Sequence, residues 1–270
     1  MKLLNGRELA DYIKERQAHQ VRGLRQANGI KPTLAIIVTA SNPIIDLYVS
    51  LKKQYGADIL VEVLVYRVLM GEVEDLIEQL NKDDSVHGII VQLPLGDVTK
   101  TDEVVNMIAP GKDVDALGSK AIFHPATPMA IMWLLSGYNI DLRGKKILLI
   151  GRGRLVGAPL ERQLLAEGMD VTVADSRTQN LDELALESDV IISAAGSPAI
   201  LFSKMIKEGA VVIDAGVASE DGKTFGDVAP EVYERDDLII TPSKGGVGPL
   251  TVTALFDNVI RASRNTLSKD

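Results

Sequence analysis

Residues 146–157 read KILLIGRGRLVG, a stretch that decides how the second half of the chain folds. The apolar run 146–150 is typical of a buried strand, and three glycines, Gly151, Gly153 and Gly157, separate it from a helical pattern. Glycines there allow a tight turn and let a pyrophosphate approach backbone amides at the positive end of a helix. The third glycine comes one residue later than in the G-x-G-x-x-G fingerprint. The stretch therefore favours a dinucleotide site, with a ligand-free glycine turn as the alternative.

Strand and helix patterns alternate on both sides of this stretch. Strands are expected at 33–39, 60–66, 87–92, 146–150, 170–174, 189–193, 210–214 and 238–241. Helices are expected at 6–28, 44–55, 72–81, 101–108, 128–135, 155–166 and 250–263. Such alternation predicts βαβ units on mostly parallel sheets. Because the pattern restarts near Asn139, we expect two α/β lobes with a boundary between Pro125 and Arg143.

Composition narrows the class of protein. Of 270 residues, 46% are apolar and 24% charged, an ordinary globular mixture, and the net charge of −8 argues against nucleic acid as a partner. The absence of cysteine excludes disulfides, thiolate metal ligands and a cysteine nucleophile. We find neither a signal-peptide pattern nor an apolar run that could span a membrane. A soluble, cytoplasmic protein without a membrane partner is therefore expected.

The residues after the expected strand 170–174 bear on the choice of dinucleotide. An acidic residue there accepts from the ribose 2′-hydroxyl of NAD, whereas a basic residue favours the 2′-phosphate of NADP. The sequence offers both in Asp175, Ser176 and Arg177, and Arg152 in the glycine loop is a further candidate for the phosphate. These residues by themselves leave both cofactors open.

Tyr48 and Lys52 are candidates for chemistry in the first lobe. Their i, i+4 spacing places the phenol and the ammonium on one face of a helix. A lysine that transfers protons needs its pKa lowered by burial or by a neighbouring cation. A pair such as Lys52-Lys53 more often forms a solvated face. Gln92 ends an apolar strand, and in α/β sheets the carboxyl ends of strands face the ligand. The alternative role for Gln92 is to cap a loop amide.

Acidic residues and histidines give weaker signals. Asp113 and Asp115 suit metal ligands, substrate acceptors or turn formers, and turn formation is the favoured role. The histidines are dispersed along the chain, so no histidine-based metal site is expected.

Taken in order, these segments resemble the bifunctional methylenetetrahydrofolate dehydrogenase/methenyltetrahydrofolate cyclohydrolase family. The resemblance covers nearly the whole chain, and its combination of the lysine, the QLPL run and the GGVGP run is highly specific. The matching runs are Tyr48-Val49-x-x-Lys52, 88–95 (GIIVQLPL), 112–115 (KDVD), Pro125-x-Thr127-Pro128, Gly151-Arg152-x-x-Leu155-Val156-Gly157-x-Pro159, 176–178 (SRT), Val212-Ile213-Asp214-x-Gly216, 226–228 (GDV) and Gly245-Gly246-Val247-Gly248-Pro249-x-Thr251.

The resemblance implies an activity and a role for each segment. The family oxidises 5,10-methylene-tetrahydrofolate with a nicotinamide cofactor and hydrolyses the methenyl product to 10-formyl-tetrahydrofolate. Lys52 would handle protons, with Gln92 tuning it, Tyr48 lining the folate face and Asp115 accepting from the pterin. The substrate set implied in this way is Tyr48, Lys52, Val91, Gln92, Leu93, Asp115, Gly245, Gly246, Val247, Gly248 and Pro249. The cofactor set is Gly151, Arg152, Gly153, Ser176, Arg177 and Val217.

The resemblance also implies how the lobes are arranged along the chain. It gives a folate-binding catalytic domain over 1–127, a Rossmann-like NAD(P)-binding domain over 128–249, and a closing helix over 250–270 that returns to the first lobe. Lys52 of the first lobe would then serve a nicotinamide presented by the second. A homodimer formed through the cofactor lobe is implied as well. NADP is the favoured cofactor because Arg152, Ser176 and Arg177 are all present, and NAD is the alternative.

Several positions depart from the family pattern. The substituted positions are Ile45 for Ser, Ala116 for Gly, Gly153 for Ser, Asp175 for His and Ser243-Lys244 for Val-Pro, and the segment 116–124 is shorter. These departures keep two alternatives open, a dehydrogenase without cyclohydrolase activity and a non-catalytic nucleotide-binding regulatory protein. A dehydrogenase similar to shikimate dehydrogenase also has two α/β lobes, but the QLPL and GGVGP runs speak against it.

Overall fold

The structure is a computed structural model that describes residues 1–220 and 223–268. The chain divides into two compact units, and each is built from separate parts of the sequence. Met1–Ala10 and Thr127–Thr251 form one, called here the glycine-loop unit. Asp11–Ala126 and Val252–Asp270 form the other, called here the lysine unit. Both contain a parallel sheet with helices, which confirms the predicted α/β class.

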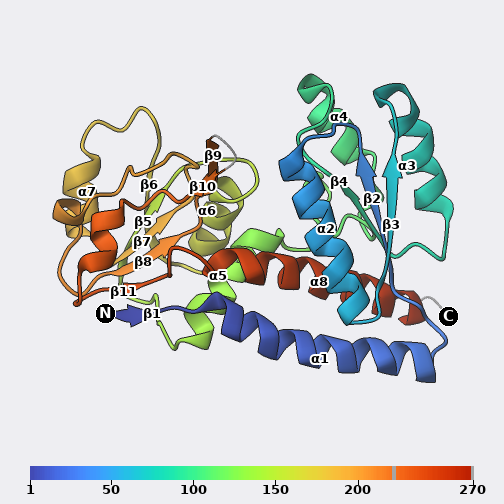
Figure 1. Cartoon of the computed structure of the whole chain (residues 1–270), viewed down its shortest axis with the longest axis horizontal. Coiled ribbons are helices and arrows are strands. Elements are labelled where there is room, and N and C mark those ends of the chain that lie inside the picture. Colours follow the sequence, from blue (N-terminus) through green and yellow to red (C-terminus); the bar gives the residue numbers. More distant parts are fainter. Residues whose placement is uncertain (221–222, 269–270) are drawn as a thin grey trace. The chain divides into compact units, whose positions relative to one another are not determined.

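The glycine-loop unit contains a six-stranded sheet in the order β1-β11-β8-β7-β5-β6 (Figure 1). Every neighbouring pair in this sheet is parallel. The strands are β1 (Lys2–Leu3), β5 (Lys146–Ile150), β6 (Asp170–Ala174), β7 (Val190–Ser193), β8 (Val211–Asp214) and β11 (Ile239–Ile240). Helices α5 (Ala126–Gly137), α6 (Gly157–Ala166) and α7 (Leu181–Glu187) accompany them, as does an antiparallel hairpin of β9 (Ala218–Glu220) and β10 (Lys223–Phe225).

Register aligns the carboxyl ends of the central strands in this sheet. Ile150 at the end of β5 pairs with Ala174 at the end of β6 and with Ser193 at the end of β7, and Ser193 pairs in turn with Asp214 at the end of β8. Leu148 of β5 is fully buried in the apolar core of the sheet, and its neighbours Ile147 and Leu149 are buried as well, as is usual for a parallel strand covered on both faces. The loops that follow β5, β6, β7 and β8 therefore emerge at one edge.

The lysine unit has a three-stranded parallel sheet in the order β3-β2-β4. Its strands are β2 (Thr33–Val38), β3 (Glu62–Arg67) and β4 (Gly88–Val91), and its helices include α2 (Pro43–Asp58), α3 (Val73–Lys82) and α4 (Thr101–Asn106). Two longer helices, α1 (Gly6–Ala27) and α8 (Val247–Asn265), give most of their residues to this unit. Short 3₁₀ turns lie at Met70–Glu72, Val98–Lys100, Ser203–Met205, Pro230–Glu234 and Thr266–Ser268.

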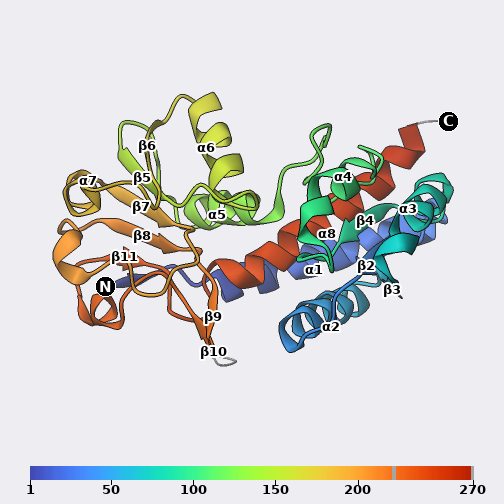
Figure 2. The ribbon, with the colours of Figure 1, turned by 90° about the horizontal axis from the view of Figure 1, so that it is seen from above.

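Polar and aromatic contacts join α1, α2 and α8 within the lysine unit. Figures 1 and 2 both show α1 and α8 side by side, and the buried Gln17 of α1 donates from Nε2 to the Thr253 carbonyl of α8 at 2.9 Å. The Tyr55 hydroxyl of α2 donates to Gln17 Oε1 at 2.8 Å, and its ring stacks on Phe256 with 5.0 Å between the centroids. The closing helix is thus part of the unit that carries Lys52, as the fold expectation required.

The sequence predicted most elements but missed some short ones. Strands 146–150 and 170–174 match β5 and β6, whereas α6 starts at Gly157 rather than at 155. Helix α8 starts at Val247, inside the GGVGP run, so Pro249 lies in its first turn, where a missing N–H costs nothing. Strand β1, helix α7 and the β9–β10 hairpin were not predicted, because runs of two to seven residues carry little periodic signal. Within the described residues no helix combines the length and apolar character that crossing a membrane requires.

Asn258 of α8 ties the shortened 116–124 segment to the rest of the lysine unit. Its side chain is fully buried, and Nδ2 donates to the Val114 carbonyl at 2.9 Å and to the His124 carbonyl at 2.8 Å. One amide group therefore holds both ends of the segment that follows Asp115.

Replacing Asn258 by leucine keeps the volume but removes both donors. Because buried carbonyls left without a donor each cost about 1–3 kcal/mol, we expect Asn258→Leu to lower the free energy of unfolding by about 2–3 kcal/mol. Chemical denaturation followed by circular dichroism measures this change. Asn265→Leu, an exposed site on the same helix, is the control and should stay within about 0.5 kcal/mol of the parent. Equal effects of the two substitutions would contradict the assigned role of Asn258.

Candidate functional site

Helix α2 positions Tyr48 and Lys52. Asn42 caps this helix, because its Oδ1 accepts from the backbone amides of Ile44 and Ile45, and Pro43 occupies the first helical position. Ile45, which stands where the family has serine, is buried in the core. The capped start and the buried face therefore fix where the exposed Tyr48 and, one turn later, the half-buried Lys52 project.

Strand β4 delivers the partner of Lys52. The strand ends at Val91. The backbone N–H of Gln92 continues the hydrogen-bond ladder of the sheet by donating to the Ile37 carbonyl at 2.8 Å. Gln92 Nε2 donates to the Leu93 carbonyl at 3.1 Å, so its Oε1 is left to accept from Lys52 Nζ, at 2.7 Å. The structure thus brings the predicted Lys52 and Gln92 together, and Gln92 presents a neutral acceptor to the amine.

Asp115 completes this cluster, whereas Asp113 has a structural role. The Asp113 carboxylate is buried and accepts from the Gly118 amide at 2.8 Å and from the Leu117 amide at 3.4 Å, as expected of a turn former. Ala116, which directly follows Asp115, has φ of +56°, in the left-handed region that favours glycine. Alanine there costs about 1–2 kcal/mol. The turn keeps the shape for which the family uses glycine, and it holds the half-buried Asp115 close to Lys52.

Burial and charge shift the pKa of Lys52 and the pKa of Asp115 in opposite directions. Burial lowers the pKa of Lys52, and the negative charge of Asp115 partly offsets that effect. Burial also raises the pKa of Asp115, against the favourable charge of Lys52. A lysine of reduced basicity beside a neutral acceptor can exist as a free amine closer to neutral pH, which is the state that accepts a proton. The lysine therefore meets the physical requirement for proton transfer.

Other members of the predicted substrate set lie in different surroundings. Val91 is buried in the apolar core of the lysine unit, and the half-buried Leu93 packs against that core. Their side chains support the strand end that carries Gln92. Gly245 to Pro249 lie in the glycine-loop unit, where Gly245 has φ of +85° and its carbonyl accepts from the Arg7 amide at 3.0 Å.

The glycine loop lies between β5 and α6 as predicted. Gly151 has φ of +95°, and a Cβ added at Gly157 would lie 2.0 Å from the Gly151 carbonyl oxygen, so both positions require glycine. Gly153 has open space around its Cβ position. The ten-residue helix α6 begins directly after the loop, with its positive end at the same edge. This arrangement suits a pyrophosphate, since backbone and helix dipole both favour an anion there.

Two arginines lie at the same edge of the sheet, each beside a carboxylate. Arg152 Nε donates to Glu161 Oε2 at 2.7 Å, and Arg177 Nη2 donates to Asp175 Oδ2 at 2.7 Å. The Arg177 guanidinium lowers the pKa of Asp175, with a smaller contribution from Arg152. Both arginine side chains are largely exposed, whereas Glu161 and Asp175 are mostly covered, so each guanidinium keeps its carboxylate partner and still offers exposed N–H donors to a phosphate.

Glu161 had no predicted role, because its contact with Arg152 spans a loop and follows no helical spacing. The remaining predicted cofactor residues, Ser176 and Val217, are exposed and follow β6 and β8. The cofactor set therefore lies in loops at the carboxyl edge of one sheet, and the residues present fit a phosphorylated dinucleotide.

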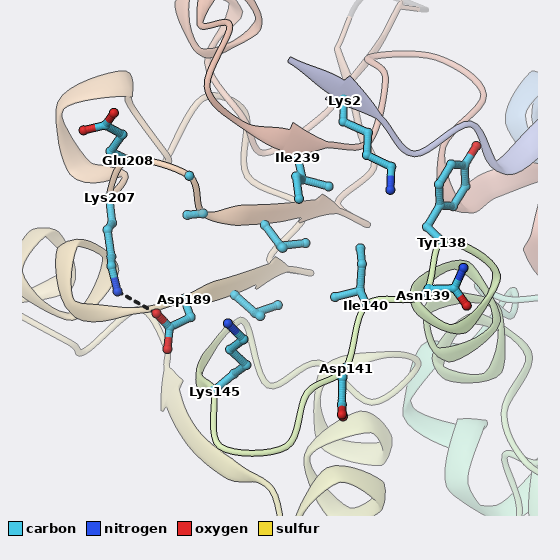
Figure 3. Close-up of a pocket in the computed structure, with 14 residues that line it drawn as sticks. Lys2, Tyr138, Asn139, Ile140, Asp141, Lys145, Asp189, Lys207, Glu208 and Ile239 are labelled. Atoms are coloured by element: carbon cyan, nitrogen blue, oxygen red, sulfur yellow. Dashed lines mark hydrogen bonds and ion pairs between the residues drawn. The ribbon is translucent and has the colours of Figure 1, made fainter.

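A hollow of about 340 Å³ lies at the opposite edge of that sheet (Figure 3). Its lining includes the first residues of four strands, namely Lys2, Val190, Val211 and Ile239. Lys207, which lines this hollow, forms an ion pair with Asp189. Since the hollow is at the amino ends of the strands, it is separate from the residues predicted to bind the cofactor.

Comparison with known proteins agrees with this geometry. Residues 4–115 match the catalytic domain of tetrahydrofolate dehydrogenase/cyclohydrolase, and residues 125–267 match the NAD(P)-binding domain of the same family. The chain is 40% identical over 277 residues to the bifunctional protein FolD of Acetivibrio thermocellus, with 97% of each chain covered.

Solved structures give the same result. The bifunctional FolD methylenetetrahydrofolate dehydrogenase/cyclohydrolase of Campylobacter jejuni superposes with a TM-score of 0.93 at 38% identity, covering 98% of this chain and 99% of that one. The Trypanosoma brucei N5,N10-methylenetetrahydrofolate dehydrogenase-cyclohydrolase, solved with NADP and an inhibitor, gives a TM-score of 0.92 at 29% identity over 98% of each chain. On these matches to both halves of its sequence, the chain belongs to the tetrahydrofolate dehydrogenase/cyclohydrolase family.

Proposed function

We propose that this protein oxidises 5,10-methylene-tetrahydrofolate to 5,10-methenyl-tetrahydrofolate with NADP and hydrolyses the product to 10-formyl-tetrahydrofolate. The observation that carries the proposal is the 2.7 Å contact between Lys52 Nζ and Gln92 Oε1, with burial lowering the pKa of the lysine. Family membership and nearly full-length similarity to bifunctional relatives support it.

Lys52 acts in the hydrolytic step as the group that takes a proton from water. As water adds to the methenyl carbon, the free amine of Lys52 accepts the proton that the oxygen loses. It returns that proton to the folate nitrogen when the carbon–nitrogen bond breaks, and the added hydroxyl releases its remaining proton to solvent as it becomes the formyl carbonyl. Gln92 accepts a hydrogen bond from Lys52 in both protonation states without adding a charge, so the amine keeps its place and its reduced basicity.

Asp115 and Tyr48 bind and orient the folate in this proposal. Asp115 offers its carboxyl group to N–H donors of the pterin; burial raises the pKa of Asp115, and a positive charge on Lys52 opposes that rise. The exposed ring of Tyr48 offers an apolar face one turn before Lys52 on α2.

Gly151, Arg152, Gly153, Ser176 and Arg177 hold the phosphates of NADP in this proposal, and Val217 lies against the nicotinamide. Bound NADP supplies the acceptor for the hydride that leaves the methylene carbon. The exposed guanidinium groups of Arg152 and Arg177 favour NADP over NAD, because either can pair with a 2′-phosphate.

We further propose that the protein works as a cytoplasmic homodimer, as the family resemblance implies. Light scattering coupled to size-exclusion chromatography measures the mass of the assembly. A mass of one chain at micromolar concentration would contradict the dimer.

Replacing Lys52 by methionine should abolish hydrolysis while the fold survives. Loss of a general acid–base group lowers turnover by about 10²–10⁴-fold, measured as decay of methenyl absorbance above the buffer rate. Lys53→Met is the matched control, since Lys53 is the exposed neighbour on the same helix and should keep parent activity. Retained hydrolysis in Lys52→Met would remove Lys52 from the mechanism. A parent protein that reduces NADP but does not hydrolyse the methenyl product would support a dehydrogenase alone.

Replacing Gln92 by glutamate should raise the pKa of Lys52. A carboxylate at the position of the neutral acceptor stabilises the ammonium and typically shifts such a pKa by about 1–3 units. The fraction of free amine at pH 7 then falls, so the rising limb of the pH–rate profile for hydrolysis moves to higher pH. Gln92→Met, which removes the acceptor without adding charge, should lower the rate without this alkaline shift. NMR titration of labelled lysines reads the pKa directly, and an unshifted Lys52 in Gln92→Glu would refute the coupling.

Replacing Arg177 by glutamine should weaken NADP binding selectively. Loss of a charge-assisted contact, together with an unpaired Asp175 beside the 2′-phosphate, raises the KM for NADP by about 10–100-fold and leaves the KM for NAD nearly unchanged. Arg143→Gln is a matched control, because Arg143 pairs with Asp141 at the same two-residue spacing, before β5 rather than after β6. Equal changes for both cofactors would show that Arg177 does not contact the 2′-phosphate.

A further inference from the structure

Asp214 and Asp227, in the glycine-loop unit, form a cluster that the proposed mechanism does not use. Asp214 is the last residue of β8, and Asp227 belongs to the GDV run that follows the β9–β10 hairpin. Asp227 is fully buried. Taking a carboxylate out of water is expensive unless hydrogen bonds compensate for the lost solvation, so its surroundings must provide donors.

Asp227 fixes the loop that follows β7. Its Oδ2 accepts from the Ser193 hydroxyl at 2.7 Å and from the Ala195 amide at 2.8 Å, and its Oδ1 accepts from the Ser197 amide at 2.9 Å. Both oxygens are therefore committed as acceptors to residues 193–197. This loop also touches the glycine loop, because a Cβ added at Gly151 would lie 2.6 Å from the Ala194 carbonyl oxygen.

Asp214 fixes the loop that follows β8 and the segment that carries Asp227. Its Oδ1 accepts from the amides of Gly216 and Asp227, both at 3.1 Å, and its Oδ2 accepts from the Val228 amide at 3.1 Å. The Tyr233 hydroxyl also hydrogen-bonds Asp214. Burial raises the pKa of Asp214, and the charge of Asp227 adds to that effect.

Two glycines make room for the carboxylates. A Cβ added at Gly216 would lie 2.0 Å from the Asp227 carboxylate, and one added at Gly226 would lie 2.1 Å from Asp214 Oδ2. A side chain at either position would displace a buried charged group together with the amides that it accepts from. The backbone of residues 215–217, which ends at the exposed Val217, is thus shaped around the Asp227 carboxylate.

We propose that Asp214 and Asp227, together called here the carboxylate clamp, are positioning residues for the nicotinamide half of the cofactor. The clamp holds the loops 194–197 and 215–217 in the conformation that receives the nicotinamide, and it acts on hydride transfer without taking part in hydrolysis. The inference rests on the proposed function, since it assigns a role within the dehydrogenase reaction.

Replacing Asp227 by asparagine tests the clamp. The amide group keeps the shape but turns one acceptor oxygen into a donor that faces either the Ala195 or the Ser197 amide. We expect the KM for NADP to rise by about 10–100-fold and the kcat of methylene oxidation to fall, because hydrogen bonds to a charged group are lost. Hydrolysis of added methenyl-tetrahydrofolate should stay within about twofold of the parent, since residues of the lysine unit perform it.

A pair of serines provides a milder test that keeps the fold. Ser193 is the last residue of β7, Ser188 precedes the strand, and both are buried. Ser193 donates to Asp227, whereas Ser188 donates to the Leu184 carbonyl of α7. Ser193→Ala should raise the KM for NADP several-fold, and Ser188→Ala should leave it unchanged. Parent-like NADP kinetics in both Asp227→Asn and Ser193→Ala would overturn the clamp, as would parallel loss of oxidation and hydrolysis.

Calorimetry with NADP separates failure of the clamp from failure of the proposed function. Weaker NADP binding in Ser193→Ala but not in Ser188→Ala supports the clamp even if the parent protein shows no folate turnover, in which case only the proposed function fails. Equal NADP affinity in the parent, in Asp227→Asn and in Ser193→Ala would overturn the clamp. Absence of NADP binding by the parent would overturn it as well.

Discussion

Parallel strands that end in register bring the residues after them together, and the functional groups of this chain depend on that constraint. In the glycine-loop unit the ends of β5, β6, β7 and β8 are aligned by direct pairing. The glycine loop, the arginine pairs and the carboxylate clamp all follow those ends. In the lysine unit, the end of β4 places Gln92 beside a lysine forty residues earlier in the sequence. Sheet register is thus the step that converts distant sequence positions into a site.

Each unit buries an ionisable side chain, Lys52 in the lysine unit and Asp227 in the glycine-loop unit, and the surroundings of the two differ. Burial of Lys52 favours its neutral form, its hydrogen-bond partner Gln92 adds no charge, and the lowered pKa suits proton transfer. Asp227 accepts from a hydroxyl and two backbone amides, and these hydrogen bonds lock the backbone that provides them. Burial thus lowers the basicity of Lys52, whereas the buried Asp227 fixes the loop that follows β7.

The sequence was informative where a pattern is local. The apolar runs of β5 and β6 end at Gly151 and Asp175, so their bounds could be predicted. Lys52 and Gln92 were candidates from their positions on a helix and at a strand end, and the resemblance gave them and Asp115 their roles. The geometry then showed the contact between Lys52 and Gln92. Interactions between remote segments left no such trace. Nothing in the letters around Asp227 indicates that it accepts from residues thirty or more positions earlier, and Glu161 meets Arg152 only because the glycine loop folds back.

Both units are discontinuous in sequence, and this has a consequence for synthesis. The glycine-loop unit takes the first ten residues as well as Thr127–Thr251, including β1, which pairs with β11 at the edge of the sheet. The lysine unit needs Val252–Asp270 to cover its core. The core of the lysine unit therefore cannot close until Val252 and the residues after it have been synthesised. Because contacts so distant in sequence form slowly, the apolar surface that α8 covers in the lysine unit stays exposed while the chain is being synthesised.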